Sequence, residues 1–198
     1  MFSSINGFSG DIGVGYTANS LRSVAITPEK TNSPDRLASL REPVPTDGAA
    51  VHQLIAHCPP LDTNSLYCNL LQCSHFRHTS VVAELDGAIV GAISGYLVPE
   101  RPDTVFVWQV AVGSAARGQG LALRMLDHIV DRTVCRDVQF METTITEANA
   151  ASWGLFRKFA DARSAALTHE IGFDRDAHFG GQHDTEMQVR IGPFASKG

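Results

Sequence analysis

The sequence lacks any long hydrophobic run. Of its 198 residues 43% are hydrophobic, but no apolar stretch approaches the roughly 20 residues that a membrane-spanning helix needs. The first 16 residues also lack the basic start and apolar segment that mark a secretory signal peptide. We therefore expect a cytoplasmic protein that does not cross a membrane.

Basic charge is also scarce. The chain has 16 lysines and arginines against 21 acidic residues, which gives a net charge of −5. Nucleic-acid-binding domains usually carry a basic patch, and anionic membranes attract cationic surfaces. The charge balance therefore indicates neither a nucleic acid nor a membrane as partner.

Cysteine is rare, and no two cysteines form a C-x-x-C pair. The four are Cys58, Cys68, Cys73 and Cys135. In a cytoplasmic protein we expect reduced thiols. Cys68 and Cys73 with His75 and His78 offer four zinc ligands, but their spacings are not those of standard zinc sites, so we predict no metal.

The composition divides the chain into one domain and two tails. Residues 1–36 are rich in Ser, Asn, Gly, Thr and Pro without a sustained apolar period, which indicates a flexible tail. Residues 37–192 are long enough to bury a core as one domain, and 193–198 form a short C-terminal tail.

Hydrophobic periodicity predicts a mixed α/β domain. In order, the pattern indicates a short strand, two helices (about 47–57 and 62–73), a hairpin turning at Asp86-Gly87, a strand (104–112), a helix (121–134), a strand (138–145), a helix (149–159) and one or two closing strands, the last at 185–191. The second helix is expected to turn Leu66, Leu70 and Cys73 inward. Because a hairpin precedes the central strand, we expect a largely antiparallel central sheet flanked by helices.

A glycine turn joins the strand 104–112 to the helix that follows. It contains Arg117-Gly118-Gln119-Gly120. A helix N-terminus presents unpaired N–H groups, and glycines let a ligand approach the backbone, so this arrangement suits an anion such as phosphate. The alternative is a plain loop that uses glycine for tight packing.

The segment "VAVGSAARGQGLALRML" resembles motif A of the GNAT (Gcn5-related N-acetyltransferase) family. The resemblance implies the GNAT fold and acetyl-CoA as cosubstrate. Ala115 stands where the family usually has Gln or Arg. The implied pantetheine contacts are backbone groups of Val110 and Val112, with an N–H near Val110 as oxyanion donor. The implied pyrophosphate contacts are Arg117, Gly118, Gln119, Gly120, Leu121 and Ala122.

"NAASWGLFRKFA" resembles a second family motif. Asn149 takes the position of an asparagine that often contacts the CoA arm. Phe156 takes the position where many members carry a tyrosine thought to protonate the leaving thiolate. Phenylalanine cannot donate a proton, so we favour core packing for Phe156, and another group or water must supply that proton.

Three further blocks, "CPPLDTNSLYCNLLQCSHF", "ISGYLVPERPDT" and "VFVWQVAV", resemble the L-2,4-diaminobutyrate acetyltransferases of ectoine biosynthesis. The resemblance spans about residues 38–192. It implies a homodimer that moves an acetyl group from acetyl-CoA to the γ-amine of a small diamino acid. The alternatives are an acetyltransferase for another amine, such as a polyamine or an aminoglycoside, and a non-catalytic acetyl-CoA sensor.

Four residues are candidate substrate contacts: Asp62, Trp108, His183 and Glu186. Asp62 can pair with an ammonium, or it can cap the helix that follows, with Asn64 and Ser65 as alternative caps. Trp108 can stack on an ammonium or belong to the core. The segment that carries His183 and Glu186 is either part of the site or a polar surface turn.

Only a neutral amine attacks a thioester, so the site needs a base. His183, Glu186, Glu142 and water are the candidates, and these residues leave the choice open. Arg77, Arg101 and Arg163 are possible partners for the substrate carboxylate.

Overall fold

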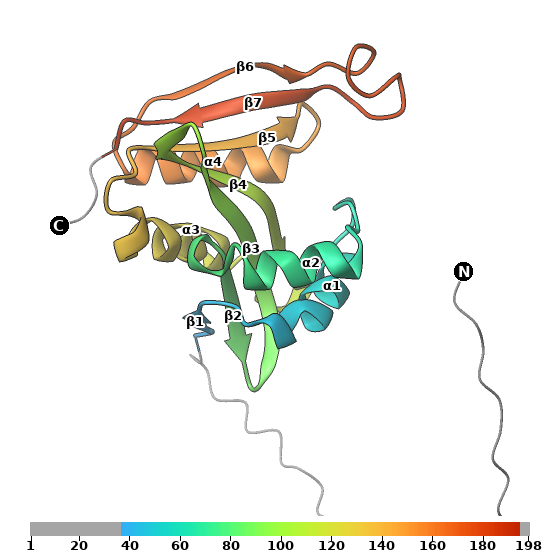
Figure 1. The fold of residues 1–198 in the computed structure, drawn as a ribbon, viewed down its shortest axis with the longest axis vertical. Coiled ribbons are helices and arrows are strands. Elements are labelled where there is room, and N and C mark those ends of the chain that lie inside the picture. The colour runs from blue at the N-terminus through green and yellow to red at the C-terminus, as the bar shows by residue number, and fades with distance from the viewer. Residues whose placement is uncertain (1–36, 195–198) are drawn as a thin grey trace, which may run out of the picture. The chain divides into compact units, whose positions relative to one another are not determined.

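The computed structural model describes residues 37–194, which are built on a seven-stranded sheet (Figure 1). The strands are β1 (Ser39–Arg41), β2 (Val81–Leu85), β3 (Ala88–Val98), β4 (Arg101–Val112), β5 (Phe140–Thr146), β6 (Leu167–Phe173) and β7 (Glu186–Ile191). The helices are α1 (Gly48–Ala56), α2 (Leu66–Ser74), α3 (Leu121–Val130) and α4 (Ala150–Ala162). The predicted N-terminal tail, residues 1–36, lies outside the described residues, as do residues 195–198.

The sheet has the order β1-β2-β3-β4-β5-β7-β6. Every neighbouring pair is antiparallel except β4 and β5, which run parallel. This confirms the mixed, largely antiparallel α/β class. The β2–β3 hairpin turns at Asp86 and Gly87, both at positive φ, as the Asp-Gly signal predicts. Within residues 37–194 no helix is long and apolar enough to cross a membrane.

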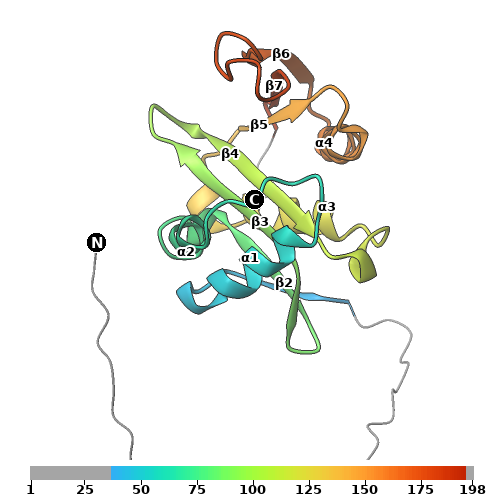
Figure 2. The ribbon, with the colours of Figure 1, turned by 90° about the vertical axis from the view of Figure 1, so that its right-hand side faces the viewer.

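Helices cover both faces of the sheet (Figures 1 and 2). On one face, Val51 and Ile55 of α1 pack against the β2–β4 part of the sheet. On the other face, Met125 of α3 and Phe159 of α4 belong to the larger core, which continues under β5 and β7. This two-sided packing explains why the apolar positions of β3 and β4 fall on both faces of these strands.

Helix α2 turns a different face inward than the one predicted. Leu66 is 44% exposed, whereas Asn69 and Gln72 are buried beside the expected Cys73. Asn69 donates to Gln72 Oε1 (3.0 Å) and its own Oδ1 lies 3.0 Å from His52 Nδ1 of α1. Paired polar groups can be buried at little cost, and this pairing is invisible to an apolar pattern.

Helix α3 ends at Val130, earlier than the predicted Val134. Arg132 has extended backbone angles (φ −79°, ψ 151°), so the helix cannot continue through it. The Arg132 guanidinium donates instead to the carbonyl oxygens of residues 77, 78 and 80, at 2.7–3.3 Å. A tertiary contact therefore overrides the local helical pattern.

The packed domain extends past the predicted boundary at residue 192. Phe194 is 4% exposed and its N–H donates to the Gln139 carbonyl oxygen at 2.9 Å. Its ring meets the Phe159 ring edge-on, with centroids 5.7 Å apart. Phe194, which the sequence assigns to the C-terminal tail, thus belongs to the core.

Candidate active site

The site is built where β4 and β5 separate. The two strands pair only between Thr104–Phe106 and Phe140–Glu142. Beyond Glu142, β5 pairs only with β7, and β4 pairs only with β3 (Figure 1). The diverging halves, residues 107–110 and 143–146, line a cavity of about 1080 Å³. Such a cleft beside strand ends is a common place for a small-molecule site.

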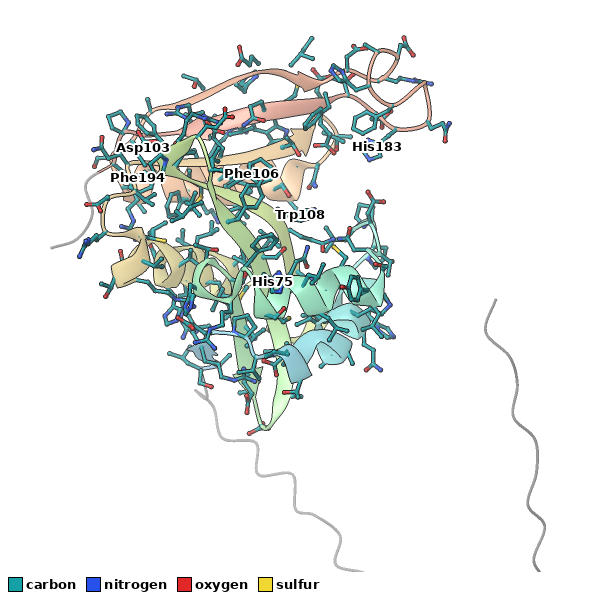
Figure 3. The ribbon with its side chains drawn as sticks, viewed as in Figure 1. His75, Asp103, Phe106, Trp108, His183 and Phe194 are labelled. Atoms are coloured by element: carbon teal, nitrogen blue, oxygen red, sulfur yellow. The ribbon has the colours of Figure 1, made fainter. Side chains whose placement is uncertain are left out.

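A β-bulge in β4 turns Trp108 toward this cavity. Ser94 of β3 pairs with Gln109, and the next residue, Gly95, pairs with Val107, so Trp108 is the extra residue. Its side chain is 45% exposed and lines the cavity (Figure 3). The bulge therefore removes Trp108 from the core, which decides against the alternative of a core tryptophan.

The α1–α2 loop is tied to β4 at the cavity edge. Gln109 Nε2 donates to the Asp62 carbonyl oxygen (2.8 Å), and Asn64 Nδ2 donates to Gln109 Oε1 (3.2 Å). Ser65 is the cap of α2, because its Oγ accepts from the Cys68 N–H at 3.1 Å. The Asp62 carboxylate is thus not needed as a cap, and Asp62 lines the cavity.

The β6–β7 loop brings His183 over the opposite side of the cavity (Figure 3). Its ring packs on Phe179, with centroids 4.8 Å apart. His183 Nδ1 lies 2.8 Å from the Asp184 carbonyl oxygen, so the neutral ring donates there and holds its lone pair on Nε2. That Nε2 is 3.9 Å from Asp62 Oδ2 and 4.0 Å from Glu186 Oε1. Two segments far apart in sequence, the α1–α2 loop and the stretch from the β6–β7 loop into β7, therefore place an imidazole between two carboxylates.

Glu186 is the first residue of β7 and faces Thr146 of β5 across the ladder. Its side chain is 18% exposed and lines the cavity. Burial raises the pKa of Glu186, and the hydrogen bond with Thr144 and the charge of His183 offset only part of that rise. A carboxylate with a raised pKa is a stronger base than an ordinary glutamate.

Glu142 is not in the cavity, so its candidacy as base is wrong. It is 3% exposed, and it accepts from Arg101 Nη2 (2.8 Å), Gln188 Nε2 (3.0 Å), and Nη1 of both Arg101 and Arg190. Burial alone raises the pKa of Glu142, but the two guanidinium groups outweigh it and hold that pKa below its usual value. This carboxylate joins β4, β5 and β7 just before the strands separate.

The arginines singled out from the sequence also pair elsewhere. Arg77 lies 3.6 Å from Glu42, Arg101 holds Glu142, and Arg163 binds Asp127 and Asp131. None of the three lines the cavity, so their predicted role toward a carboxylate is wrong.

Sequence reasoning missed Arg175, which does line the cavity. Its backbone N–H donates to Thr185 Oγ1 at 3.1 Å, next to Glu186. The one sequence signal is its place in the segment that leads to His183, between β6 and β7.

The glycine turn stands apart from the cavity, at the end of β4. Gly118 and Gly120 have φ values of +76° and +70°, and Gly120 precedes α3 without a side-chain cap. Arg117 Nε donates to the Val112 carbonyl oxygen (2.9 Å), and Gln119 Nε2 donates to that of Ala115 (3.0 Å). The turn is therefore braced by its own side chains, while the N–H groups at the start of α3 are left for an anion.

The predicted site residues therefore divide into two groups. The cavity is lined by Asp62, Trp108, Val110, Asn149, His183 and Glu186. Outside its lining lie Val112, Arg117, Gly118, Gln119, Gly120, Leu121 and Ala122. The Leu121 side chain is 4% exposed in the core, so only backbone groups of that residue can bind a ligand.

Helix α4 contributes its N-terminus to the cavity. Asn149 caps the helix, with Oδ1 accepting from the Ser152 N–H at 3.1 Å, and its amide lies at the cavity wall. Phe156 is 2% exposed and belongs to the core, which confirms the packing role. The hydroxyl that a tyrosine would offer is therefore missing from this wall.

The described thiols are not reactive groups of the cavity. Burial raises the pKa of Cys73 and of Cys135 to about 11, so both are protonated near neutral pH. Cys58 Sγ lies 3.4 Å from the Val112 carbonyl oxygen. In residues 37–194 no group of three His, Cys, Asp or Glu side chains is placed to hold a metal ion.

Comparison with known proteins identifies this architecture. The sequence model of the acetyltransferase (GNAT) family matches residues 49–160. The ribosomal-protein-S18-alanine N-acetyltransferase of Escherichia coli shares the fold, with a TM-score of 0.63 at 15% identity over 82% of this chain and 97% of that one. The chain belongs to the GNAT acetyltransferase family.

Similar sequences and a similar solved structure show which group within the family this chain resembles. The L-2,4-diaminobutyric acid acetyltransferase of Methylotuvimicrobium alcaliphilum is 53% identical over 84% of this chain and 96% of that protein. The L-2,4-diaminobutyric acid acetyltransferase of Halomonas elongata is 49% identical over 78% of this chain and 81% of that protein. A solved structure of the Paenibacillus lautus diaminobutyrate acetyltransferase, in complex with L-2,4-diaminobutyric acid and coenzyme A, aligns with a TM-score of 0.77 at 39% identity, over 81% of this chain and 97% of that one. Within the GNAT family, this chain is a member of the diaminobutyrate acetyltransferase group.

Proposed function

We propose that the protein transfers the acetyl group of acetyl-CoA to the γ-amine of L-2,4-diaminobutyrate, which yields N4-acetyl-2,4-diaminobutyrate for ectoine synthesis. The observation that carries this proposal is the acidic cavity beside the β4 bulge, where Asp62 and Glu186 flank His183. A substrate with two ammonium groups suits such a cavity. The names of the relatives and the ligands of the Paenibacillus lautus structure support the choice of substrate.

The residues present fit acetyl-CoA as cosubstrate. The uncapped start of α3, with two glycines at positive φ and Arg117 beside it, has the donors that a pyrophosphate requires. Backbone groups of Val110 and Val112 on the free side of β4 would hold the pantetheine, and Asn149 lies at the same cavity wall. Acetyl-CoA supplies the acetyl group as an activated thioester.

Glu186 and His183 are the groups that prepare the amine. The γ-ammonium must lose a proton before its nitrogen can attack, and either residue can accept that proton. Glu186 has the raised pKa of a buried base, and His183 holds its lone pair on Nε2. The amine nitrogen then bonds to the acetyl carbon, and the carbon–sulfur bond breaks. The nitrogen gives up a second proton as the amide forms, which balances the proton that CoA takes up as it leaves as the thiol.

Other groups position the two reactants. The bulge at Trp108 interrupts the ladder next to Val110, so a backbone N–H of this segment can polarise the thioester carbonyl. Asp62 would pair with the α-ammonium that is not acetylated. The exposed face of Trp108 would stack on a cationic group of the substrate.

The test is an assay of CoA release with the purified full chain. Acetyl-CoA is offered with diaminobutyrate, spermidine or an aminoglycoside, and mass spectrometry with NMR identifies the acetylated nitrogen. The expected result is the highest kcat/KM for diaminobutyrate, with acetylation at N4. Binding of acetyl-CoA in calorimetry without turnover of any amine would identify a sensor instead, and a preference for spermidine would overturn the substrate.

The same proposal includes a homodimer in the cytoplasm, as the family resemblance implies. Analytical ultracentrifugation of the full chain tests the dimer, and fractionation of cells that produce the protein tests its location.

A further inference from the structure

The charged residues of the cavity are unevenly divided. Its lining includes three carboxylates, Asp62, Asp184 and Glu186, but a single Lys or Arg, which is Arg175. Diaminobutyrate carries two ammonium groups and one carboxylate. The acids account for the two cationic groups, and the carboxylate of the substrate also needs a donor.

The fold holds Arg175 next to the catalytic candidates. Phe173, at the end of β6, pairs with Glu186 at the start of β7, and Arg175 follows two residues later. The hydrogen bond from the Arg175 N–H to Thr185 Oγ1 closes the base of the loop. Inside the loop, Phe173 contacts the rings of His178 and Phe179, at centroid distances of 5.7 and 6.2 Å. The position of Arg175 is thus set by a braced loop.

The Arg175 guanidinium itself is not engaged. It forms no hydrogen bond or ion pair with any of residues 37–194, although Asp174 and Asp176 flank it in the sequence. The Asp174 carboxylate accepts from the N–H groups of Asp176 and Ala177, both at 2.9 Å, and these bonds lower the pKa of Asp174. The turn thus satisfies this acid and leaves the exposed arginine available at the cavity wall.

We propose that the Arg175 guanidinium binds the α-carboxylate of diaminobutyrate and thereby makes the site specific for a diamino acid over a simple diamine. This inference rests on the proposed function. The planar guanidinium matches both oxygens of a carboxylate, and a bidentate pair fixes orientation as well as charge. With the α-carboxylate held by Arg175 and the α-ammonium by an acid, the γ-amine is the end of the substrate left to reach the base.

The experiment compares two substrates that differ only in the carboxylate. Loss of that group turns diaminobutyrate into 1,3-diaminopropane, which keeps both amines. Arg175→Gln is expected to lower kcat/KM for diaminobutyrate by about 10- to 100-fold, mainly through KM. 1,3-Diaminopropane is followed both as a substrate and as a competitive inhibitor. Its kcat/KM and its inhibition constant with Arg175→Gln are expected to stay within about twofold of those of the parent chain. Arg175→Lys keeps the charge but loses the planar pair of donors. Its kcat/KM for diaminobutyrate is expected to fall between that of the parent chain and that of Arg175→Gln.

The control is Arg136→Gln, which removes the same charge from an arginine 75% exposed in its side chain and outside the cavity lining. It is expected to leave all constants unchanged. If Arg175→Gln lowers kcat/KM equally for both substrates, the role of Arg175 is structural. If it leaves kcat/KM for diaminobutyrate unchanged, another group binds the carboxylate. Either result overturns the inference. Failure of the parent chain to acetylate diaminobutyrate would instead overturn the proposed function.

Discussion

Glu142→Gln is the substitution that separates a structural carboxylate from a catalytic one. The side chain is 3% exposed, and it accepts hydrogen bonds from Arg101, Arg190 and Gln188. Glutamine has the same shape but no charge, and its amide nitrogen would face donors. We expect the variant to fold, to lose stability and to keep its catalytic rate.

The magnitude follows from the burial of the partners. Breaking a fully buried ion pair costs about 3–5 kcal/mol. Here Arg101 and Arg190 are 47% and 33% exposed in their side chains and can return to water. The expected loss is therefore smaller, about 2–3 kcal/mol, or about 5–10 °C in Tm for a chain of this size.

The stability difference depends on pH in a defined direction. The fold lowers the pKa of Glu142, so it favours the ionised form. The stabilisation is fully present above the unfolded-state pKa of about 4.3 and is lost as the pH falls through the lower folded-state pKa. The gap between the parent chain and the variant should therefore be widest near neutral pH and should shrink below about pH 4.

Urea unfolding followed by tryptophan fluorescence measures the stability, since Trp153 is packed in the core. Glu84→Gln is the control, because Glu84 pairs with Arg41 at 3.1 Å in a more exposed setting and should cost under about 1 kcal/mol. The activity assay is run at a temperature where the variant is folded. A kcat reduced about 100-fold or more, with unchanged stability, would refute this reasoning and restore Glu142 as the base.

Three further predictions concern the cavity and the glycine turn. Glu186→Gln should lower kcat by about 10²- to 10⁴-fold and abolish the acidic limb of the pH–rate profile. In the parent chain this limb should lie above the usual glutamate pKa of about 4.3, because burial raises the pKa of Glu186. An acidic limb that is unchanged in the variant would point to His183 as the base. Gly120→Ala, at φ +70°, should cost about 1–2 kcal/mol and raise the KM for acetyl-CoA but not for the amine, as steady-state kinetics with each substrate varied will show. Asp62→Asn should raise the KM for diaminobutyrate at constant Tm, whereas Ser65→Ala should lower stability by about 1 kcal/mol at constant KM, and the reverse pattern would make Asp62 the cap.

Local signals predicted most of the fold. Asp86-Gly87 marked the hairpin, and the proline pair after Cys58 marked the end of α1, because each signal acts through its own backbone. The order of elements followed, and the structure has two closing strands where the sequence left one or two open. The inner face of α2 was predicted wrongly, since its buried Asn69 and Gln72 depend on a partner from another helix.

The site was predictable only in part, for the same reason. Asp62, His183 and Glu186 lie in segments that the family resemblance marked, and the structure brings them together. The partners of Glu142 could not be predicted, because Arg101 and Arg190 are 41 and 48 residues away in sequence. The only sequence signal for Arg175 is its place in the segment that leads to His183, because its position in the cavity depends on how the β6–β7 loop folds back on β7.

The two glutamates of neighbouring strands show how one ladder gives one residue type two roles. Glu142 pairs with Arg190 and Glu186 pairs with Thr146, so they stand at opposite ends of the β5–β7 pairing. At the end where β4 is still attached, a third strand supplies Arg101, and the pKa of Glu142 falls. At the other end β4 has separated and a cavity takes its place, so no guanidinium group offsets the burial that raises the pKa of Glu186. The separation of β4 from β5 therefore decides which carboxylate holds the sheet together and which one faces the cavity as the proposed base.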